Sequence, residues 1–176
     1  MDSDYFLIKK MKKGEEDAFD VFVRKYYSSI LQYCMYRCHD EEMAKDITQD
    51  TFVRFFTKLS DYTHLGKVKN YLYTIAGNLC KNQYKKIGEI PVDDMETLLE
   101  TEGVKSEEGK LIIKIEVEQA LGQLPDELLE VVILYYFQGL KLSEIADVLK
   151  IGLPLVKYRM KRAKSLLKKI LEQEDV

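Results

Sequence analysis

The sequence is poor in residues that interrupt helices. Only three of its 176 residues are proline and nine are glycine, whereas 46% are hydrophobic and 32% are charged. Proline and glycine are the residues that most disfavour a helix interior, so long helices with a buried face are expected. A chain of this length can form one domain or two small ones, and the residue pattern has to decide between them.

The sequence also lacks membrane and export signals. No apolar run approaches the roughly 20 residues that a helix needs to cross a bilayer. The first residues, Met1 to Asp4, show neither the basic start nor the apolar stretch of a signal peptide. We therefore expect the protein to stay in the cytoplasm.

Reactive side chains are equally scarce. Cys34, Cys38 and Cys80 form an odd and sparse set, which favours reduced core thiols over a disulfide framework. His39 follows Cys38, but no second closely spaced pair completes a tetrahedral metal site. His64 is the only other histidine and no glycine-rich phosphate loop is visible, so we expect no catalytic activity, no metal and no cofactor.

Three amphipathic helices are predicted in the first half of the chain. Apolar residues recur at steps of three and four over residues 16–38, 41–59 and 67–86, the signature of helices that bury one face. These helices are expected to form a first domain, residues 1–86.

A connector is predicted at residues 87–112. From Ile87 to Gly109 the periodicity is lost, and Gly88, Pro91 and Gly103 stand among acidic residues, which is the composition of a solvated, flexible linker. The linker offers no apolar face for docking. We therefore expect the flanking domains to fold separately and to move relative to one another.

A helix-turn-helix is predicted in the second domain, residues 113–176. Pro125 opens a helix that Gly139 ends, and residues 142–150 form a short helix. A turn at residues 152–154 then leads into a basic helix. Two helices joined by so short a turn, the second one basic, have the geometry of a DNA-binding motif.

The basic helix belongs to a chain with a net charge of −3. An acidic net charge by itself disfavours binding to nucleic acid. From Lys150 to Leu171 the chain carries eight lysines and arginines and no acid. On a helical wheel Val156 and Met160 face inward, which leaves the basic side free to enter a DNA groove. The candidate contacts on that side are Pro154, Leu155, Lys157, Tyr158, Lys161, Arg162, Ser165 and Lys168.

Two sets of residues resemble the extracytoplasmic-function (ECF) sigma factors of bacterial RNA polymerase. Leu124-Pro125, Gly139, Glu144-Ile145-Ala146 and Arg162-Ala163 resemble their fourth region, which reads the minus-thirty-five promoter element. Residues 46–52 resemble the second-region helix that grips the polymerase β′ clamp, and residues 71–78 resemble the next helix, which handles the minus-ten element. Both sets occur in the family's order, and the chain has no large middle domain.

The resemblance implies an all-α protein of two small helical domains with no catalysis of its own. It implies a factor that binds RNA polymerase core, directs it to specific promoters and helps to open promoter DNA. The implied partners are the β′ clamp and β flap of the core enzyme, promoter DNA and an anti-sigma factor.

Two further sets of site residues are expected in the first domain. Polar residues outside the apolar stripe of the second helix are the candidate contacts with core polymerase, namely Asp46, Gln49, Asp50 and Arg54. The loop at 60–67 and the exposed face of the third helix mix aromatic, amide and basic groups, which suit an extruded single-stranded base. These candidate minus-ten contacts are Tyr62, His64, Lys67, Lys69, Asn70, Tyr71, Tyr73, Asn78 and Asn82. Tyr71 also shares the apolar stripe, which favours a place in the core over a contact with DNA for this residue.

Several positions depart from the family pattern. Tyr71 stands where tryptophan is usual, Gly77 where arginine is common, Lys141 where a capping serine is usual, and Lys150 where a turn glycine is frequent. Gly152 and Leu155 replace hydroxyl residues that cap a helix or bind phosphate. We expect the fold to be kept, while the promoter sequence does not follow from the family.

Two other functions fit parts of the pattern: a helix-turn-helix regulator that is not a sigma factor, and a helical protein-interaction module. Transcription with purified core polymerase separates them. A sigma factor by itself directs core polymerase to promoters, whereas a regulator does so only when another sigma factor is present. An interaction module gives no promoter-dependent transcription.

The predicted linker can be tested by limited digestion. Proteases should cut first between Ile87 and Gly109, because a solvated segment without an apolar face reaches a protease before a packed helix does. Mass spectrometry of the early fragments checks this. First cleavage inside either helical half would contradict the two-domain organisation.

Overall fold

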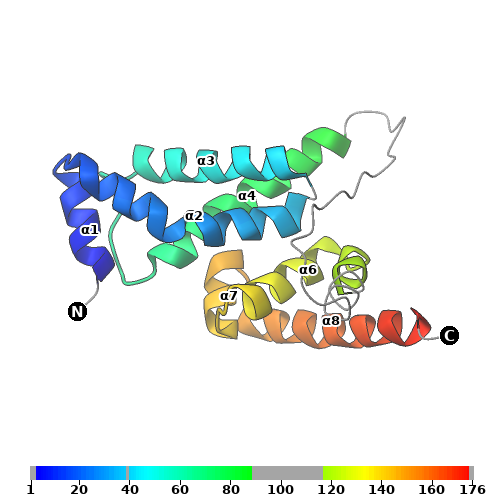
Figure 1. Cartoon of the computed structure of the whole chain (residues 1–176). Helices are drawn as coiled ribbons and strands as arrows, with labels where there is room; N and C mark the ends of the chain where they lie inside the picture. Colours follow the sequence, from blue (N-terminus) through cyan, green and yellow to red (C-terminus); the bar gives the residue numbers. More distant parts are fainter. Residues whose placement is uncertain (1–2, 39, 89–116, 175–176) are drawn as a thin grey trace, which may run out of the picture.

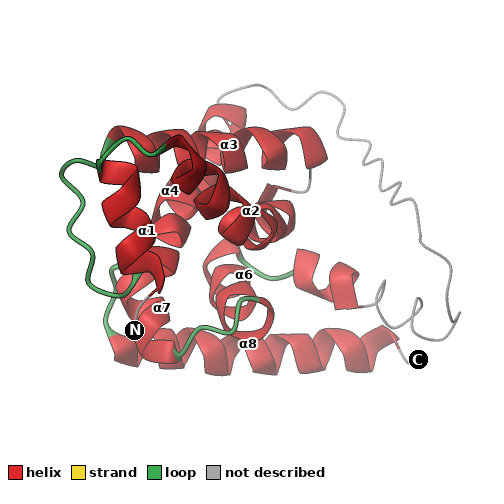
Figure 2. Cartoon of the chain, turned by 60° about the vertical axis from the view of Figure 1, so that its left-hand side comes forward, coloured by secondary structure: helices red, strands yellow, loops and turns green. Residues whose placement is uncertain are grey.

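Every regular element that the computed structural model describes is a helix (Figures 1 and 2). The described residues are 3–38, 40–88 and 117–174, so most of the predicted linker lies outside them. The all-α prediction is confirmed. None of the helices in these ranges is long and apolar enough to span a bilayer.

The first domain is built from α1 (Ser3–Lys12), α2 (Glu16–Cys38), α3 (Glu41–Thr57) and α4 (Val68–Gly88). The last three match the predicted helices to within two residues at each end. Their apolar stripes meet in an aromatic core, where the rings of Phe22 and Phe55 stack with centroids 4.9 Å apart. The side chain of Asp40 begins α3 by accepting a hydrogen bond from the Met43 amide at 2.6 Å.

Helix α1 was not predicted. Ten residues are too few to form a stable helix alone, and α1 depends on tertiary contacts. Its Asp4 carboxylate accepts a hydrogen bond from the Tyr26 hydroxyl at 2.6 Å. Lys12 donates to the backbone carbonyls of Ser60 at 3.1 Å and of Tyr62 at 2.7 Å. The helix therefore fixes the loop that follows α3, which carries candidate minus-ten residues.

The second domain contains a helical segment at 117–122, α6 (Asp126–Val132), the π-helical turn η1 (Ile133–Phe137), α7 (Leu142–Leu149) and α8 (Leu153–Glu174). The helix predicted after Pro125 thus ends in a π turn. Gly139 follows it with φ +68°, a left-handed conformation that glycine adopts without steric cost. Helices α7 and α8 form the predicted helix-turn-helix.

The turn between α7 and α8 passes through Lys150, which has φ +54°. Lysine occupies the position where the family often has glycine, and the backbone explains why glycine suits it. At the start of α7 the usual capping hydroxyl is also missing. The Glu144 carboxylate partly compensates by accepting a hydrogen bond from the Lys141 amide at 2.8 Å.

The two domains pack against each other, which differs from the expectation that they move independently. Helix α4 contacts α7, and α2 contacts η1. Figure 1 shows the helices of the first domain above those of the second. The Tyr36 ring lies 4.4 Å from that of Phe137 between centroids, and the Thr74 hydroxyl donates to the Val148 carbonyl at 3.1 Å. Linker composition predicts how a linker behaves, but it carries no information on whether the flanking helices fit together.

Replacement of Lys150 by glycine should stabilise the protein by about 0.5–1 kcal/mol. The left-handed conformation costs a residue with a Cβ roughly 1–2 kcal/mol, of which about 0.5–1 kcal/mol is offset by the chain entropy that glycine loses on folding. Urea unfolding measures the difference. Lys150→Ala is the matched control, because it removes the charge but keeps the Cβ, and an equal gain from both variants would contradict the argument.

Candidate polymerase and DNA interfaces

The outer face of α3 carries the candidate core-polymerase contacts. Asp46, Gln49, Asp50 and Arg54 are all exposed, and their spacing places them along one side of the helix. Their side chains are left for solvent or a partner. Val53 lies in the same stripe and is 60% exposed. Sequence reasoning passed over Val53, although an apolar residue outside the buried stripe is itself a signal of a contact surface.

The outer face of α8 carries the candidate minus-thirty-five contacts. All eight predicted residues are exposed: Pro154, Leu155, Lys157, Tyr158, Lys161, Arg162, Ser165 and Lys168. On the inner side Val156, Met160 and Ala163 are buried, so the predicted orientation of the helix is confirmed. Arg159 points toward α6 and pairs with Glu127 at 2.9 Å, which holds α8 against the rest of its domain.

The aromatic residues of the loop before α4 and of the first turn of α4 are half-buried. The rings of Tyr62 and Tyr71 stack with centroids 5.3 Å apart and 24° between planes, and Tyr62 also packs edge-on against Phe55. Tyr62, His64 and Tyr71 are each partly exposed. Tyr71 therefore packs on the core, as its place in the apolar stripe predicts. Its ring is still partly exposed, as a contact with a DNA base requires.

The exposed face predicted for α4 is largely covered. Asn78 and Asn82 are exposed, but Tyr73 and Asn70 are buried, so the prediction that they face solvent was wrong. The Tyr73 hydroxyl donates to the Gln138 side chain at 2.6 Å, and burial raises the pKa of Tyr73, which keeps it a donor.

Two lysines near the start of α4, Lys67 just before the helix and Lys69 within it, also contact the second domain. Lys69 donates to the Gln138 carbonyl at 3.2 Å, and Lys67 contacts the Asp147 carboxylate at 2.6 Å. The amphipathic pattern of α4 distinguished core from non-core positions. It could not show that the non-core face meets a second domain rather than water.

A buried carboxylate lies at the centre of this contact. Glu130 of α6 is 2% exposed and accepts a hydrogen bond from the Tyr33 hydroxyl at 2.9 Å. Lys81 approaches it at 3.0 Å and Arg37 at 3.9 Å. Arg37 is fully buried and contacts the Asp126 carboxylate at 2.8 Å. Burial, and secondarily the Glu130 charge, raise the pKa of Tyr33 well above its ordinary value, so the phenol remains protonated.

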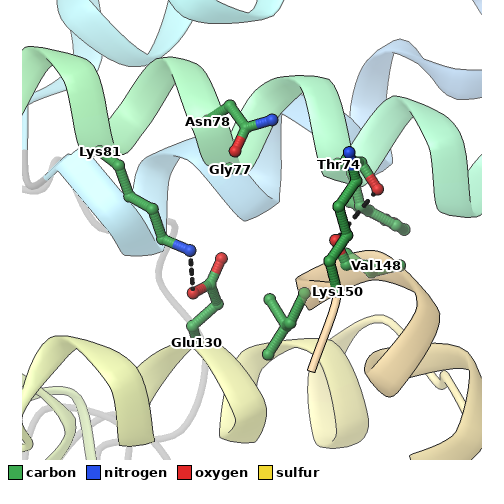
Figure 3. A pocket seen from close by; sticks show the side chains of 9 residues that line it. Thr74, Gly77, Asn78, Lys81, Glu130, Val148 and Lys150 are labelled. Carbon is green, nitrogen blue, oxygen red and sulfur yellow. Dashed lines mark hydrogen bonds and ion pairs between the residues drawn. The ribbon is translucent and has the colours of Figure 1, made fainter. Parts of the chain in front are cut away.

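A cavity of about 30 Å³ lies beside Glu130, between α4 and the second domain (Figure 3). Lys81, Asn78 and Lys150 are among the residues that line it. This space is polar and suits water but no larger ligand. In the described ranges no group of three or more histidine, cysteine or acidic residues is arranged to hold a metal.

The three cysteines lie in the core of the first domain, as predicted. The sulfur atoms of Cys38 and Cys80 are 3.5 Å apart. A hydrogen bond with Cys34, together with burial, raises the pKa of Cys80 to about 12, so this thiol stays protonated and unreactive at neutral pH. His39 lies outside the described residues.

Two family descriptions match the chain, Sigma-70 region 2 over residues 22–89 and Sigma-70, region 4 over residues 114–167. The chain is 30% identical to the ECF RNA polymerase sigma factor SigW of Bacillus subtilis, over 93% of its own length and 94% of that protein. It is 33% identical to sigma factor YlaC of the same organism, over 87% and 91% of the two chains.

The fold is also that of solved sigma factors. The structure of CnrH in complex with the cytosolic domain of CnrY matches with a TM-score of 0.74 at 22% identity, covering 98% of this chain and 99% of that one. RpoE of Bartonella quintana, in complex with the anti-sigma factor NepR, matches with a TM-score of 0.69 at 19% identity, over 88% and 96% of the chains.

These matches define the class, a bacterial sigma factor with regions 2 and 4. The chain belongs to the extracytoplasmic-function sigma factors. It is a transcription initiation factor that directs RNA polymerase to promoters, and not an enzyme. The predicted family and function are thus confirmed, whereas the domain boundaries at 86 and 113 and the individual site residues stay predictions.

Reversing the charge of Asp50 should weaken binding to core polymerase. Asp50→Lys should cost about tenfold in affinity, since one misplaced charge at an interface is worth on the order of 1 kcal/mol. Titration of labelled core measures this, with helix content followed by circular dichroism. Asp20→Lys, at an exposed aspartate of α2, makes the same charge change elsewhere. Equal affinity of both variants would exclude this face of α3.

Proposed function

We propose that this sigma factor works through three surfaces. The outer face of α3 binds the β′ clamp, the 60–67 loop with α4 binds the minus-ten element, and α8 reads the minus-thirty-five element in the major groove. The second domain also contacts the β flap. The main support for the proposal is the orientation of α8. Every candidate contact on this helix is exposed, whereas its opposite side is buried in the core.

Selectivity arises from tethering rather than from one tight site. Each DNA-reading surface is small, and linkage through core polymerase raises the effective concentration of the second surface once the first has bound. The acidic net charge of −3 limits sequence-independent attraction to DNA. The free chain therefore does not bind DNA indiscriminately, and the holoenzyme selects promoters that carry both elements at a suitable spacing.

On α8 the outward residues divide into two kinds of contact. Tyr158, Lys161 and Arg162 lie where a helix in the major groove meets base edges, whereas Lys157 and Lys168 flank that face toward the phosphates. Leu155 is 41% exposed and supplies an apolar contact near the start of the helix. The family's hydroxyl residues are missing there, so the upstream sequence that this chain prefers differs from that of relatives that carry them.

At the minus-ten element, the stacked pair Tyr62 and Tyr71 offers an aromatic platform beside His64. A base extruded from the duplex stacks on such rings. Exposed Asn78 and Asn82 supply amides for base edges or phosphates. Capture of the extruded base stabilises the open strands, which is how the factor helps to open promoter DNA.

An anti-sigma factor is the further partner that we propose. The similar RpoE structure is a complex with the anti-sigma factor NepR. The chain acts in the cytoplasm, where core polymerase and promoter DNA are found.

Transcription reactions with purified core polymerase test the proposed function. Genomic DNA fragments serve as template, and start sites are mapped with and without the chain. A sigma factor produces defined starts that share two upstream elements at one spacing. If defined starts appear only when a second sigma factor is added, the chain is a regulator instead.

Substitution of two lysines of α8 should change DNA binding in two different ways. Lys161→Ala should cost about 1–3 kcal/mol at its preferred base and relax the upstream preference, because Lys161 is placed at a base edge. Lys168→Ala should weaken binding equally across sequences and reduce the salt slope by about one counterion. Holoenzyme binding to a panel of upstream elements at several salt concentrations measures both effects.

The control is Lys13→Ala, at an exposed lysine far from α8 in the sequence. If Lys161→Ala keeps the wild-type affinity and preference, α8 does not present this face to DNA.

A further inference from the structure

Helix α1 lies beside the loop between α3 and α4 (Figures 1 and 2). It packs onto the first domain through Ile8 and Met11, which are 3% and 2% exposed. Its exposed side carries Tyr5 and Phe6, which are 50% and 47% exposed. Exposed aromatic residues that adjoin one another indicate a contact surface, whereas single exposed apolar residues are ordinary.

The Tyr5 ring begins a row of rings that continues into the loop and that we call the aromatic row: Tyr5, His64, Tyr62 and Tyr71. The centroids of Tyr5 and His64 are 6.4 Å apart, and those of His64 and Tyr62 are 6.1 Å apart. Tyr62 in turn stacks on Tyr71 at 5.3 Å. These separations exceed the roughly 3.4 Å between neighbouring nucleotides of a duplex strand. The aromatic row therefore suits a single strand whose bases are unstacked and spread apart.

We propose that α1 is part of the DNA-binding surface. The Tyr5 ring stacks on an unpaired base of the strand that the 60–67 loop holds at the minus-ten element, and Lys9 neutralises the adjoining phosphate. The inference rests on the function proposed for the loop and adds a site to it. The family description of region 2 begins at residue 22, so α1 lies outside it.

The charges of α1 favour a nucleic acid as the occupant of this surface. Lys9 is exposed and follows Tyr5 by one helical turn, so both lie on the same side. The only acid of the helix, Asp4, is held by α2, where the Lys25 ammonium approaches it at 2.5 Å and the Tyr26 hydroxyl donates to it at 2.6 Å. An aromatic ring beside a lysine supplies the stacking and the phosphate neutralisation that single-stranded DNA needs.

The position of Tyr5 relative to the loop is set before DNA binds. The Lys12 ammonium donates from α1 to the carbonyls of Ser60 and Tyr62, at 3.1 Å and 2.7 Å. Phe6 packs edge-on against the Tyr5 ring, with centroids 5.5 Å apart and 83° between the planes. A ring that is already held in place loses little conformational freedom when a base stacks on it. Lys12 and Phe6 therefore act as positioning residues for Tyr5.

Photo-cross-linking of the full chain bound to core polymerase tests where the strand lies. The probe is an oligothymidylate in which bromouracil replaces thymine, because irradiated bromouracil joins to an aromatic ring in contact with it. Mass spectrometry should find DNA on Tyr5 as well as on the 60–67 loop. The same probe paired with oligoadenylate is the control and should leave Tyr5 unmodified. Absence of DNA from Tyr5, or equal modification by both probes, would overturn the proposal.

Substitutions of Tyr5 separate base stacking from a general apolar contact. Tyr5→Leu keeps an apolar side chain but loses the ring, and it should weaken binding of the polymerase complex to oligothymidylate about tenfold, the usual effect of one stacked base. Tyr5→Phe should bind like the wild type. Tyr136→Leu is the matched control, because Tyr136 of the second domain is 55% exposed, and it should also bind like the wild type.

These variants also test a protein as the occupant. Helix content followed by circular dichroism should be the same in all of them, since Tyr5 and Tyr136 are both exposed. Equal affinity of Tyr5→Leu and the wild type for oligothymidylate would refute the stacking role. If Tyr5→Leu instead weakens binding to core polymerase, the surface contacts protein and the proposal is wrong.

Lys9→Ala should reduce the salt dependence of oligothymidylate binding. One phosphate contact on a single strand contributes about 0.7 to the slope of log affinity against log salt concentration, and the slope should fall by that amount. Lys10→Ala is the matched control, because Lys10 lies roughly 140° from Tyr5 around the helix. Equal slopes for the two variants would overturn the role given to Lys9.

These measurements need no promoter, so they can be read separately from the transcription reactions. If DNA cross-links to Tyr5 while the chain directs no defined starts, the proposed function fails and the single-strand site on α1 stands. If the starts are defined while Tyr5 takes up no DNA, the site on α1 fails and the proposed function stands.

Discussion

The arrangement of this molecule depends on the burial of one carboxylate. Glu130 belongs to the second domain, yet its hydrogen-bond donor and its cations belong to the first. A buried charge tolerates little displacement of its partners. Its position therefore sets where α6 lies against α2 and α4, and η1 and α7 follow because they continue the same chain. Apolar contacts such as Tyr36 on Phe137 add area but allow more freedom of position.

The three surfaces proposed for polymerase and DNA are consequently not equivalent in the structure. The polar side of α3 and the basic side of α8 are open to partners, whereas the face of α4 is engaged within the molecule. In the proposed function, the two open surfaces make the first contacts, one with polymerase and one with duplex DNA. The covered surface is proposed to act later, once the strands begin to separate.

Periodicity predicted the helices of both domains and the inward side of α8, because Val156, Met160 and Ala163 obey a simple wheel within one element. It failed where an outcome depends on contacts distant in sequence. Helix α1 depends on docking to Tyr26 and to the loop after α3. Tyr73 and Asn70 were placed in solvent because nothing in their own helix indicates a second domain above them. Val53 differs from these residues, because the helical pattern of α3 already places it outside the buried stripe. Its place on a possible contact surface could therefore have been predicted from the sequence.

The π-helical turn η1 has a consequence for how such chains diverge. Its backbone bonds reach one residue further than in an α-helix, as from the Gln138 amide to the Ile133 carbonyl at 3.1 Å. Such a turn absorbs one extra residue, because a bond that spans five residues closes the same turn that a bond spanning four closes in an α-helix. Loss of a single codon between Ile133 and Gln138 would restore α-helical spacing across this bond and leave Gln138 beside Tyr73 and Lys69. The turn is therefore a place where the chain can change in length by one residue while the contacts of Gln138 are kept.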